Sequence, residues 1–254
     1  MSGERARLRP VEDVETRTRR DLAAAFRWAA RLGYNEGIAN HFSAAVSDDG
    51  SRFLLNPDGR HFSRVRASEL LLLDARDPEA GSGKAAADAT AWFIHAHIHM
   101  ALPHARCIMH THMPHATALS CLKEFEFPPL DQNAMRYFRR VVWDSTFNGM
   151  ALDDQEGRRI ASALGDDKFV LMMANHGVTV IGSSVAEAFD RLYYFERACQ
   201  TLVLALSTGR ELNVPRDEVA LMTRRQWDDQ PELIDKHLSE LRAILDEEEP
   251  EYAS

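Results

Sequence analysis

Apolar residues recur at intervals of three and four along several stretches of this chain, which is the pattern of helices with one buried face. In residues 12–33 the pattern ends at Gly33, a residue suited to a helix C-cap. The same spacing predicts further helices at residues 88–102, 114–121, 153–164 and 185–207, and a final charged helix over 216–249.

Shorter apolar runs bounded by turn residues predict β-strands. They cover residues 40–47, 52–56, 70–73, 106–110, 169–173 and 178–181. Asn56-Pro57-Asp58-Gly59 is a strong turn signal, and the small residues of 78–87 indicate a loop. Because strands of mixed spacing alternate with long helices, we expect an α/β or α+β domain.

Composition narrows the class of protein. The chain has 254 residues, 45% of them hydrophobic, and a formal net charge of −9, so it can bury one large core and lacks the basic surface of a nucleic-acid-binding protein. The three cysteines are scattered, which fits a reducing cytoplasm better than a disulfide framework. No apolar run reaches the roughly 18 residues of a membrane span, and the first residues show no signal-peptide pattern. We therefore expect a cytoplasmic protein that binds neither nucleic acid nor a membrane.

Histidines carry the candidate chemistry. Seven of the eleven lie within residues 95–115, where an apolar run ends in His-Thr-His. Side chains two positions apart leave a strand on the same face, so His110 and His112 can present two nitrogens together. His176 follows 64 residues after His112, beside Gly177 and between two predicted strands. Three imidazoles with open positions would hold one divalent ion, with zinc, manganese and iron as the alternatives.

Further histidines lie near this set in the sequence. His95 and His99 are four residues apart on one predicted helical face, and such a pair can either bind metal or hold a ligand or substrate through hydrogen bonds. We expect the second role for His95 and leave His99 open between the two. His115, one helical turn beyond the ligands, is a candidate for substrate contact. His41 follows a turn that could line a pocket, although a structural role is the simpler interpretation.

These motifs together resemble the class II aldolase/adducin superfamily, which includes fuculose-phosphate aldolase and ribulose-5-phosphate 4-epimerase. The matching pieces are Asn40-His41-Phe42-Ser43, Asn56-Pro57-Asp58-Gly59, His95, Ile108–Ala116 and Asn175-His176-Gly177. The resemblance implies a three-layer α/β/α fold around a mainly antiparallel central sheet. It also implies one divalent metal per subunit, held by His110, His112 and His176, and a homotetramer with active sites at subunit interfaces.

The resemblance covers about residues 18–210, which divides the chain into three parts. Residues 1–17 form an N-terminal extension, 18–212 the class II aldolase/adducin-like domain, and 213–254 a charged helical appendage that wraps a neighbour or stays partly mobile. Candidate substrate contacts are Asn40, Asn56, Gly59, Thr90 and His99.

The chain departs from the sugar-phosphate aldolases of this family at the position of their catalytic acidic residue. That residue precedes the first ligand histidine by 19 positions, where this chain has Ala91. Alanine cannot accept a proton, so the ordinary base is missing. The serine pair that helps to bind phosphate in those enzymes is Ala89-Thr90 here, and the charge of Asp58 would repel a nearby phosphate. We infer that the small-molecule substrate is not a sugar phosphate.

Three functions remain as hypotheses. The first is a metal-dependent lyase, either decarboxylase-like or aldolase-like, acting on a non-phosphorylated hydroxy or oxo acid, with aromatic acids among the candidates. Decarboxylation needs a Lewis acid and a later proton donor but no base, and His95, His115 or Tyr137 could return the proton. The second is a non-heme iron oxygenase of an aryl hydroxy or oxo acid on the same site. The third is a non-catalytic module of the adducin type.

The remaining aromatic and basic residues leave two questions open. Tyr193 and Tyr194 are alternative hydroxyl donors for the same proton. The arginines that follow a proline-containing loop either clamp a substrate carboxylate or belong to a surface helix; they are Arg136, Arg139 and Arg140.

Overall fold

A seven-stranded sheet runs through the centre of the molecule in this computed structural model, which describes residues 13–77, 79–80 and 87–254. The strand order is β3-β2-β1-β4-β7-β6-β5, and every neighbouring pair is antiparallel except β5 and β6, which are parallel. The strands are β1 (His41–Ala45), β2 (Arg52–Leu55), β3 (Leu71–Asp74), β4 (Cys107–Thr111), β5 (Val141–Asp144), β6 (Val170–Met173) and β7 (Gly177–Gly182). The predicted mainly antiparallel α/β sheet is therefore confirmed.

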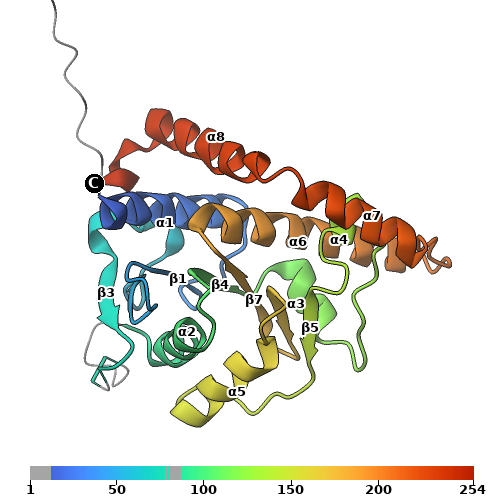
Figure 1. Ribbon diagram of the computed structural model, residues 1–254, viewed down its shortest axis with the longest axis horizontal. Coiled ribbons are helices and arrows are strands. Elements are labelled where there is room, and N and C mark those ends of the chain that lie inside the picture. The colour runs from blue at the N-terminus through green and yellow to red at the C-terminus, as the bar shows by residue number, and fades with distance from the viewer. Residues whose placement is uncertain (1–12, 78, 81–86) are drawn as a thin grey trace, which may run out of the picture.

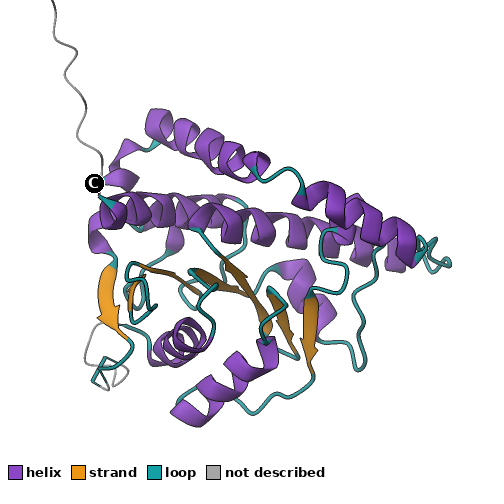
Figure 2. Ribbon diagram, in the orientation of Figure 1, coloured by secondary structure: helices purple, strands orange, loops and turns teal. Residues whose placement is uncertain are grey.

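Helices cover both faces of this sheet (Figures 1 and 2). On one face lie α2 (Ala89–Ala101) and α5 (Asp154–Leu164), which pack against each other and against the sheet. On the other face lie α1 (Val14–Arg31), α3 (Pro114–Ser120) and the long α6 (Val185–Ser207). The remaining helices are α4 (Gln132–Met135), α7 (Asp217–Asp228) and α8 (Glu232–Glu248), with short 3₁₀ turns at Phe62–Arg64, Ala67–Glu69 and Pro250–Ala253.

Strand alternation divides the core between the two faces. Met109 and Val180 point with Phe42 into the apolar cluster beneath α1 and α6. Ile108 and Ile181 point into the cluster beneath α2 and α5. Each strand of the centre is buried on both sides, which is why these segments read as continuous apolar runs rather than as alternating ones.

The strand register sets polar side chains in a row on the α2 face. His41 of β1 lies opposite His110 of β4, and His110 lies opposite Thr179 of β7. Ser43 points to the same side as His41, because it is two residues further along β1. One line across three strands thus carries hydrogen-bonding groups inside an otherwise apolar layer.

Three elements differ from the sequence-based expectations. The strand β5 and the short helix α4 were not predicted, since β5 has only four residues and follows no clear turn signal. The helix expected over 216–249 is two helices, separated at residues 229–231. Pro231 explains the break, because a proline ring within a helix clashes with the carbonyl four residues earlier and supplies no N–H.

The C-terminal segment packs against its own chain. The helix α8 lies over α1 and α6 (Figure 1), and the Trp28 indole donates a hydrogen bond to the Leu241 carbonyl at 2.8 Å. Arg27 pairs with Glu249 at 2.9 Å. Tyr252 is fully buried in a small cluster with Ala23 and other small residues of α1. The segment is an outer layer on the helical face, and the proposed division of the chain at residue 212 stays a prediction.

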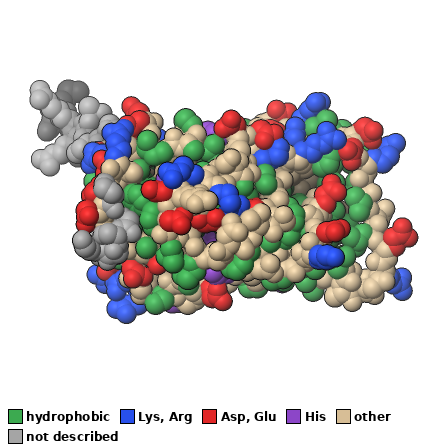
Figure 3. All heavy atoms as spheres, turned by 90° about the horizontal axis from the view of Figure 1, so that it is seen from below, with side chains coloured by type: hydrophobic (Ala, Val, Ile, Leu, Met, Phe, Trp, Pro, Cys, Tyr) green, Lys and Arg blue, Asp and Glu red, His purple; other side chains and the backbone are tan. Residues whose placement is uncertain are grey.

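None of the helices in the described ranges has both the length and the apolar character required to cross a membrane. Acidic and basic side chains are interspersed over the face seen in Figure 3, which views the molecule from the side of α2 and α5. The predicted extension of residues 1–17 and the predicted loop of residues 78–87 fall mostly outside the described residues.

We predict that Tyr252→Ala lowers the free energy of unfolding by about 3–5 kcal/mol, because it removes a buried aromatic ring from the contact between the C-terminal segment and α1. Leu233→Ala is the matched control: Leu233 belongs to α8 but is 38% exposed, so its loss should cost less than about 1 kcal/mol. Urea unfolding followed by circular dichroism measures both. Equal, small losses would mean that the C-terminal segment does not contribute to the fold.

Candidate metal centre

Three histidines converge at the end of the β4 strand. One ring nitrogen from each of His110, His112 and His176 lies within 4.8 Å of the others. The Nε2 atoms of His110 and His112 are 3.3 Å apart, and two ligands about 2.1 Å from a tetrahedral metal are separated by about 3.4 Å. The three residues therefore fit a divalent ion, as the sequence predicted.

The local fold forces this approach. His110 is the last residue but one of β4, His112 follows the strand directly, and His176 lies in the turn between β6 and β7. Asn175 adopts a φ of 56°, a left-handed conformation that asparagine tolerates better than most residues. A Cβ atom on Gly177 would stand 2.6 Å from the Thr111 carbonyl oxygen and 2.8 Å from Cδ2 of His112, so only glycine permits this contact.

Hydrogen bonds at the far nitrogen orient two of the three rings. The Thr179 hydroxyl donates to the Met173 sulfur at 3.6 Å and accepts from Nδ1 of His110 at 3.1 Å. Nδ1 of His112 donates to the carboxylate of Glu36. Because each ring holds its proton on Nδ1, both Nε2 lone pairs face the centre, which is the usual arrangement of histidine ligands.

Burial keeps two of the three candidate ligands unprotonated. Desolvation lowers the pKa of His110 well below its ordinary value and lowers that of His176 to about 4. Neutral imidazole is the form that binds metal. His110 and His176 are therefore uncharged at neutral pH, and Glu36 lies behind the third ring, His112.

A cavity of about 250 Å³ opens beside the three histidines. Phe147 and Met150 form an apolar wall, and the Phe147 ring centroid lies 6.2 Å from that of His176. Both belong to the loop between β5 and α5 and are otherwise exposed. The lining residues are Ala39, His41, Thr90, Ile94, His110, His112, Phe147, Gly149, Met150, Ala151, Asn175 and His176. None of them is a lysine or an arginine.

The histidines His95 and His99 lie behind the cavity rather than on its surface. His95 contacts His41 through Nε2 at 2.7 Å, and its other nitrogen contacts the Ser43 hydroxyl. His99 reaches the same hydroxyl at 2.8 Å. His41, for which the sequence favoured a structural role, lines the cavity, and its ring stacks on that of His110 at a centroid distance of 4.8 Å.

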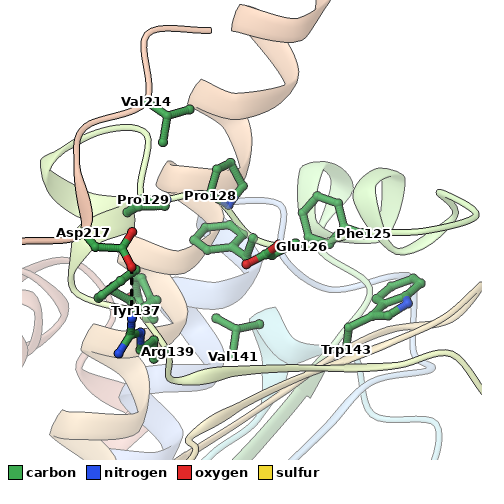
Figure 4. A pocket seen from close by; sticks show the side chains of 12 residues that line it. Phe125, Glu126, Pro128, Pro129, Tyr137, Arg139, Val141, Trp143, Val214 and Asp217 are labelled. Carbon is green, nitrogen blue, oxygen red and sulfur yellow. Dashed lines mark hydrogen bonds and ion pairs between the residues drawn. The ribbon is translucent and has the colours of Figure 1, made fainter. Parts of the chain in front are cut away.

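The structure does not bring His115 or Tyr137 to this cavity. His115 faces α6, where the carboxylate of Glu196 accepts from its Nδ1 at 2.8 Å and from its backbone N–H. Tyr137 is fully buried and donates to the Arg191 carbonyl at 2.6 Å. It lines a separate cavity of about 490 Å³ with Phe125 and Trp143 (Figure 4). Catalytic roles for His115 and Tyr137 stay predictions.

The candidate substrate contacts occupy different depths. Thr90 lines the cavity and donates its hydroxyl to Asp88. Asn40 is buried behind the lining, where its Oδ1 accepts from the Glu36 backbone N–H at 2.6 Å and its amide Nδ2 has no partner among the described residues. Asn56 accepts from the backbone of Phe42 at 3.2 Å.

Two further positions lie away from the cavity. Gly59 occupies a turn with a φ of 68° and lines no part of the cavity. Ala91 is 1% exposed and packs in an apolar cluster with Phe53, Leu55 and Trp92. The position of the family's acidic residue is therefore closed by packing.

The arginines after the proline-containing loop do not face the metal centre. Arg136 pairs with Asp190 and lies over the rings of Tyr194 and Trp227, with its guanidinium carbon 4.4 and 4.5 Å from the ring centroids. Arg139 and Arg140 pair with acids of α7, as the dashed contact of Arg139 in Figure 4 shows. These ion pairs fasten α7 to the domain. Tyr193 and Tyr194 pack against His237 of α8.

Four contributors to the site were not predicted from the sequence. Thr179 and Glu36 orient ligand histidines, while Phe147 and Met150 form the apolar wall. Thr179 could have been found by pairing the strands, because it lies opposite His110. The other three lie in loops, where no local pattern indicates which residues meet.

The chain belongs to the family of class II aldolase and adducin N-terminal domains, which matches residues 20–203. A solved aldolase II superfamily protein from Pseudomonas syringae is 31% identical and has a TM-score of 0.84, covering 96% of this chain and 98% of its own. The decarboxylase NovR of Streptomyces niveus is 31% identical over 205 residues, which are 80% of this chain and 75% of NovR.

A third relative is described as an oxygenase. It is the 4-hydroxy-3-prenylphenylpyruvate oxygenase/4-hydroxy-3-prenylbenzoate synthase of Streptomyces roseochromogenus subsp. oscitans, 30% identical over 80% of this chain and 73% of its own length. Class II aldolases use a divalent metal, and the three-histidine group supplies ligands for one here.

We predict that the protein as purified, or after reloading with Zn²⁺, contains about one metal ion per chain and that His112→Ala contains less than about a tenth of that, because two imidazoles rarely hold a divalent ion through purification. The exposed His104 provides the control variant His104→Ala. Mass spectrometry measures the metal content per chain of the wild type and both variants. Equal metal content in the three proteins would exclude this site.

Acid should destabilise the metal-free protein through its buried histidines. Burial lowers the folded-state pKa of His41 and of His99 to about 3, whereas an unfolded histidine has a pKa of about 6.5. The unfolded chain binds more protons between these values, so stability falls as the pH drops below about 6.5 and keeps falling toward about 3. Between pH 7 and pH 5 each of these rings should lower the free energy of unfolding by about 2 kcal/mol.

The variant His99→Gln tests this account. Its free energy of unfolding in urea should fall by about 2 kcal/mol less than that of the wild type between pH 7 and pH 5, because one titrating ring is gone. An identical pH dependence in the two proteins, both measured with a chelator present, would contradict the assignment.

Proposed function

We propose that this protein is a metal-dependent lyase that cleaves a C–C bond in a non-phosphorylated hydroxy or oxo acid, with decarboxylation as the favoured reaction. One observation carries the proposal: the three metal ligands are intact, while the position of the family's acidic base is Ala91, buried among apolar side chains. Decarboxylation requires stabilisation of developing negative charge but no initial proton abstraction.

The residues in and around the cavity have different roles in the proposed reaction. A divalent ion bound by His110, His112 and His176 would supply Lewis-acid stabilisation of negative charge on the substrate. Thr179 and Glu36 hold the ligand rings in position. Asn40 offers an unpartnered amide donor close to the centre, and the apolar wall excludes water, which strengthens every electrostatic contact inside.

The lining of the cavity favours an acid without phosphate. A phosphate group is usually held by arginine, lysine or a helix N-terminus, and the described lining contains no basic side chain beyond histidine. Phe147 and Met150 instead suit an apolar or aromatic group. The relationship to the decarboxylase NovR supports the reaction class.

An iron-dependent oxygenase is the second candidate. Three neutral imidazoles suit Fe(II) and leave positions for further ligands, and the oxygenase of Streptomyces roseochromogenus supports this alternative. We also propose a cytoplasmic homotetramer in which a neighbouring subunit completes the cavity, since Phe147, Met150 and Leu152 expose 52%, 69% and 58% of their surfaces beside it.

The experiment that separates these functions compares Zn²⁺-, Mn²⁺- and Fe²⁺-loaded protein on a panel of aryl 2-hydroxy acids, aryl 2-oxo acids and ortho-hydroxybenzoates. Carbon dioxide release without oxygen uptake supports the lyase, and oxygen uptake restricted to the iron protein supports the oxygenase. Metal binding without turnover of any acid would favour a binding module of the adducin type.

We predict that Ala91→Glu does not create retro-aldol activity on L-fuculose 1-phosphate above the wild-type background, because the new carboxylate would enter an apolar cluster and the cavity lacks a phosphate site. Release of the aldehyde and of dihydroxyacetone phosphate is measured with coupled dehydrogenases. Appearance of retro-aldol activity would refute the argument against sugar phosphates. Circular dichroism of the variant checks that it folds, and Ala91→Gln is the uncharged control.

A further inference from the structure

A chain of four buried side chains runs from the cavity into the layer between the sheet and α2. It begins at His41, whose Nδ1 lies 2.7 Å from Nε2 of His95. It continues through the Ser43 hydroxyl to Nε2 of His99 at 2.8 Å. It ends where Nδ1 of His99 meets the Ala105 carbonyl oxygen at 2.8 Å. All four side chains are at most 4% exposed.

The final carbonyl determines the position of every proton in the chain. A carbonyl oxygen only accepts, so Nδ1 of His99 carries the proton and its Nε2 must accept from Ser43. Ser43 has one hydroxyl hydrogen, so its oxygen accepts from Nδ1–H of His95. Nε2 of His95 is then a lone pair and accepts from Nδ1–H of His41. Nε2 of His41 is left without a proton.

These proton positions hold when each ring carries one proton. His95 and His99 are buried, and no carboxylate hydrogen bonds to either ring among the described residues. Burial without a counter-charge disfavours the charged imidazolium and lowers the pKa of both rings. His95 and His99 are therefore neutral, each with a single N–H. His41 is also buried, its side chain hydrogen bonds to His95 and to no carboxylate among the described residues, and its ring stacks on His110 beside the candidate cation site, so this environment disfavours a second proton on it.

The free nitrogen of His41 belongs to a residue that lines the cavity. It has no hydrogen-bond partner in the described part of the chain. Apart from the three candidate metal ligands, His41 is the only titratable side chain in the described lining. Phe147 and Met150 offer it no donor, and the hydroxyl of Thr90 donates to Asp88, so a bound ligand with a hydroxyl group can satisfy the lone pair.

We propose that His41, fixed by His95, Ser43 and His99, is a permanent hydrogen-bond acceptor that selects a 2-hydroxy acid over the corresponding 2-oxo acid; this rests on the proposed function of the cavity. The hydroxyl of a 2-hydroxy acid donates to Nε2 of His41. A 2-oxo acid presents only lone pairs there, and two facing acceptors repel. His95, Ser43 and His99 act as positioning residues.

Nitrogen NMR of the imidazole rings tests the first half of the proposal without a substrate. In ¹⁵N-histidine-labelled, metal-free protein, long-range proton–nitrogen correlation spectra distinguish protonated from unprotonated ring nitrogens. Each histidine is assigned by its conservative variant, for example His41→Gln. We expect the proton on Nδ1 in His41, His95 and His99. A proton on Nε2 of His41 would overturn the proposal.

Ligand selection tests the second half. The probes are mandelate, which has the 2-hydroxyl, and phenylglyoxylate, which has a 2-oxo group and cannot enolise. Calorimetry on the Zn²⁺-loaded protein should give a dissociation constant about 10-fold lower for mandelate, because phenylglyoxylate leaves the buried acceptor unsatisfied. O-methylmandelate, which keeps the oxygen but not the donor, should bind as weakly as phenylglyoxylate. Equal or tighter binding of phenylglyoxylate, or no binding of mandelate, would overturn the substrate assignment.

The variant Ser43→Ala connects the two halves. Its mandelate preference should fall below about 3-fold, because the proton positions of His95 and His41 are no longer fixed, while the zinc content stays at the wild-type value. Ser207→Ala is the control, since Ser207 is exposed and bonds only within α6. If folded Ser43→Ala keeps the wild-type preference for mandelate, the hydrogen-bonded series of His41, His95, Ser43 and His99 is not the cause of that preference. If no acid is turned over while the NMR and binding results are as expected, the proposed lyase function is wrong, but the proposed selectivity of His41 is still supported.

Discussion

The antiparallel register of β1, β4 and β7 is the constraint on which the rest of the site depends. It sets His41, His110 and Thr179 in one line across the sheet. A shift of a single residue in either pairing would turn one of these side chains to the opposite face. The apolar residues that alternate with them are packed beneath α1 and α6, so such a shift would also expose part of the core. The chemistry and the hydrophobic core therefore fix the same register.

Much of this arrangement could be predicted from the sequence, because periodicity reveals long helices and apolar strands. The pair His110 and His112 followed from strand alternation, and His176 from its place between two apolar runs. The breadth of the resemblance then supplied the layered fold. Local patterns could not show which loop residues meet, and so Phe147, Met150 and Glu36 were missed. The role of His41 was hidden for the same reason, since its partners are 54 and 69 residues away in the chain.

Neutrality is the common property of the polar groups inside this layer. As metal ligands His110, His112 and His176 are neutral imidazoles. Burial disfavours the charged form of His41, His95 and His99 behind them, and hydroxyl and carbonyl groups complete the hydrogen bonds. A buried carboxylate at position 91 would have to be desolvated in the apolar cluster around Trp92. An alanine at position 91 is thus consistent with the apolar packing around it. The helix α2 contributes to this packing and to the polar groups, because Ala91, His95 and His99 follow one another at four-residue intervals along its buried face.

Three uncharged ligands have a thermodynamic consequence for metal retention. Carboxylate or thiolate ligands would compensate much of a divalent charge, whereas imidazoles leave almost all of it available to whatever enters the cavity. An anionic acid then gains affinity from the ion, and by reciprocity the ion gains the same factor from the acid. The described lining has no basic residue besides histidine to share this attraction. If the cavity takes the proposed acid, the ion should consequently be held most tightly when the cavity is filled.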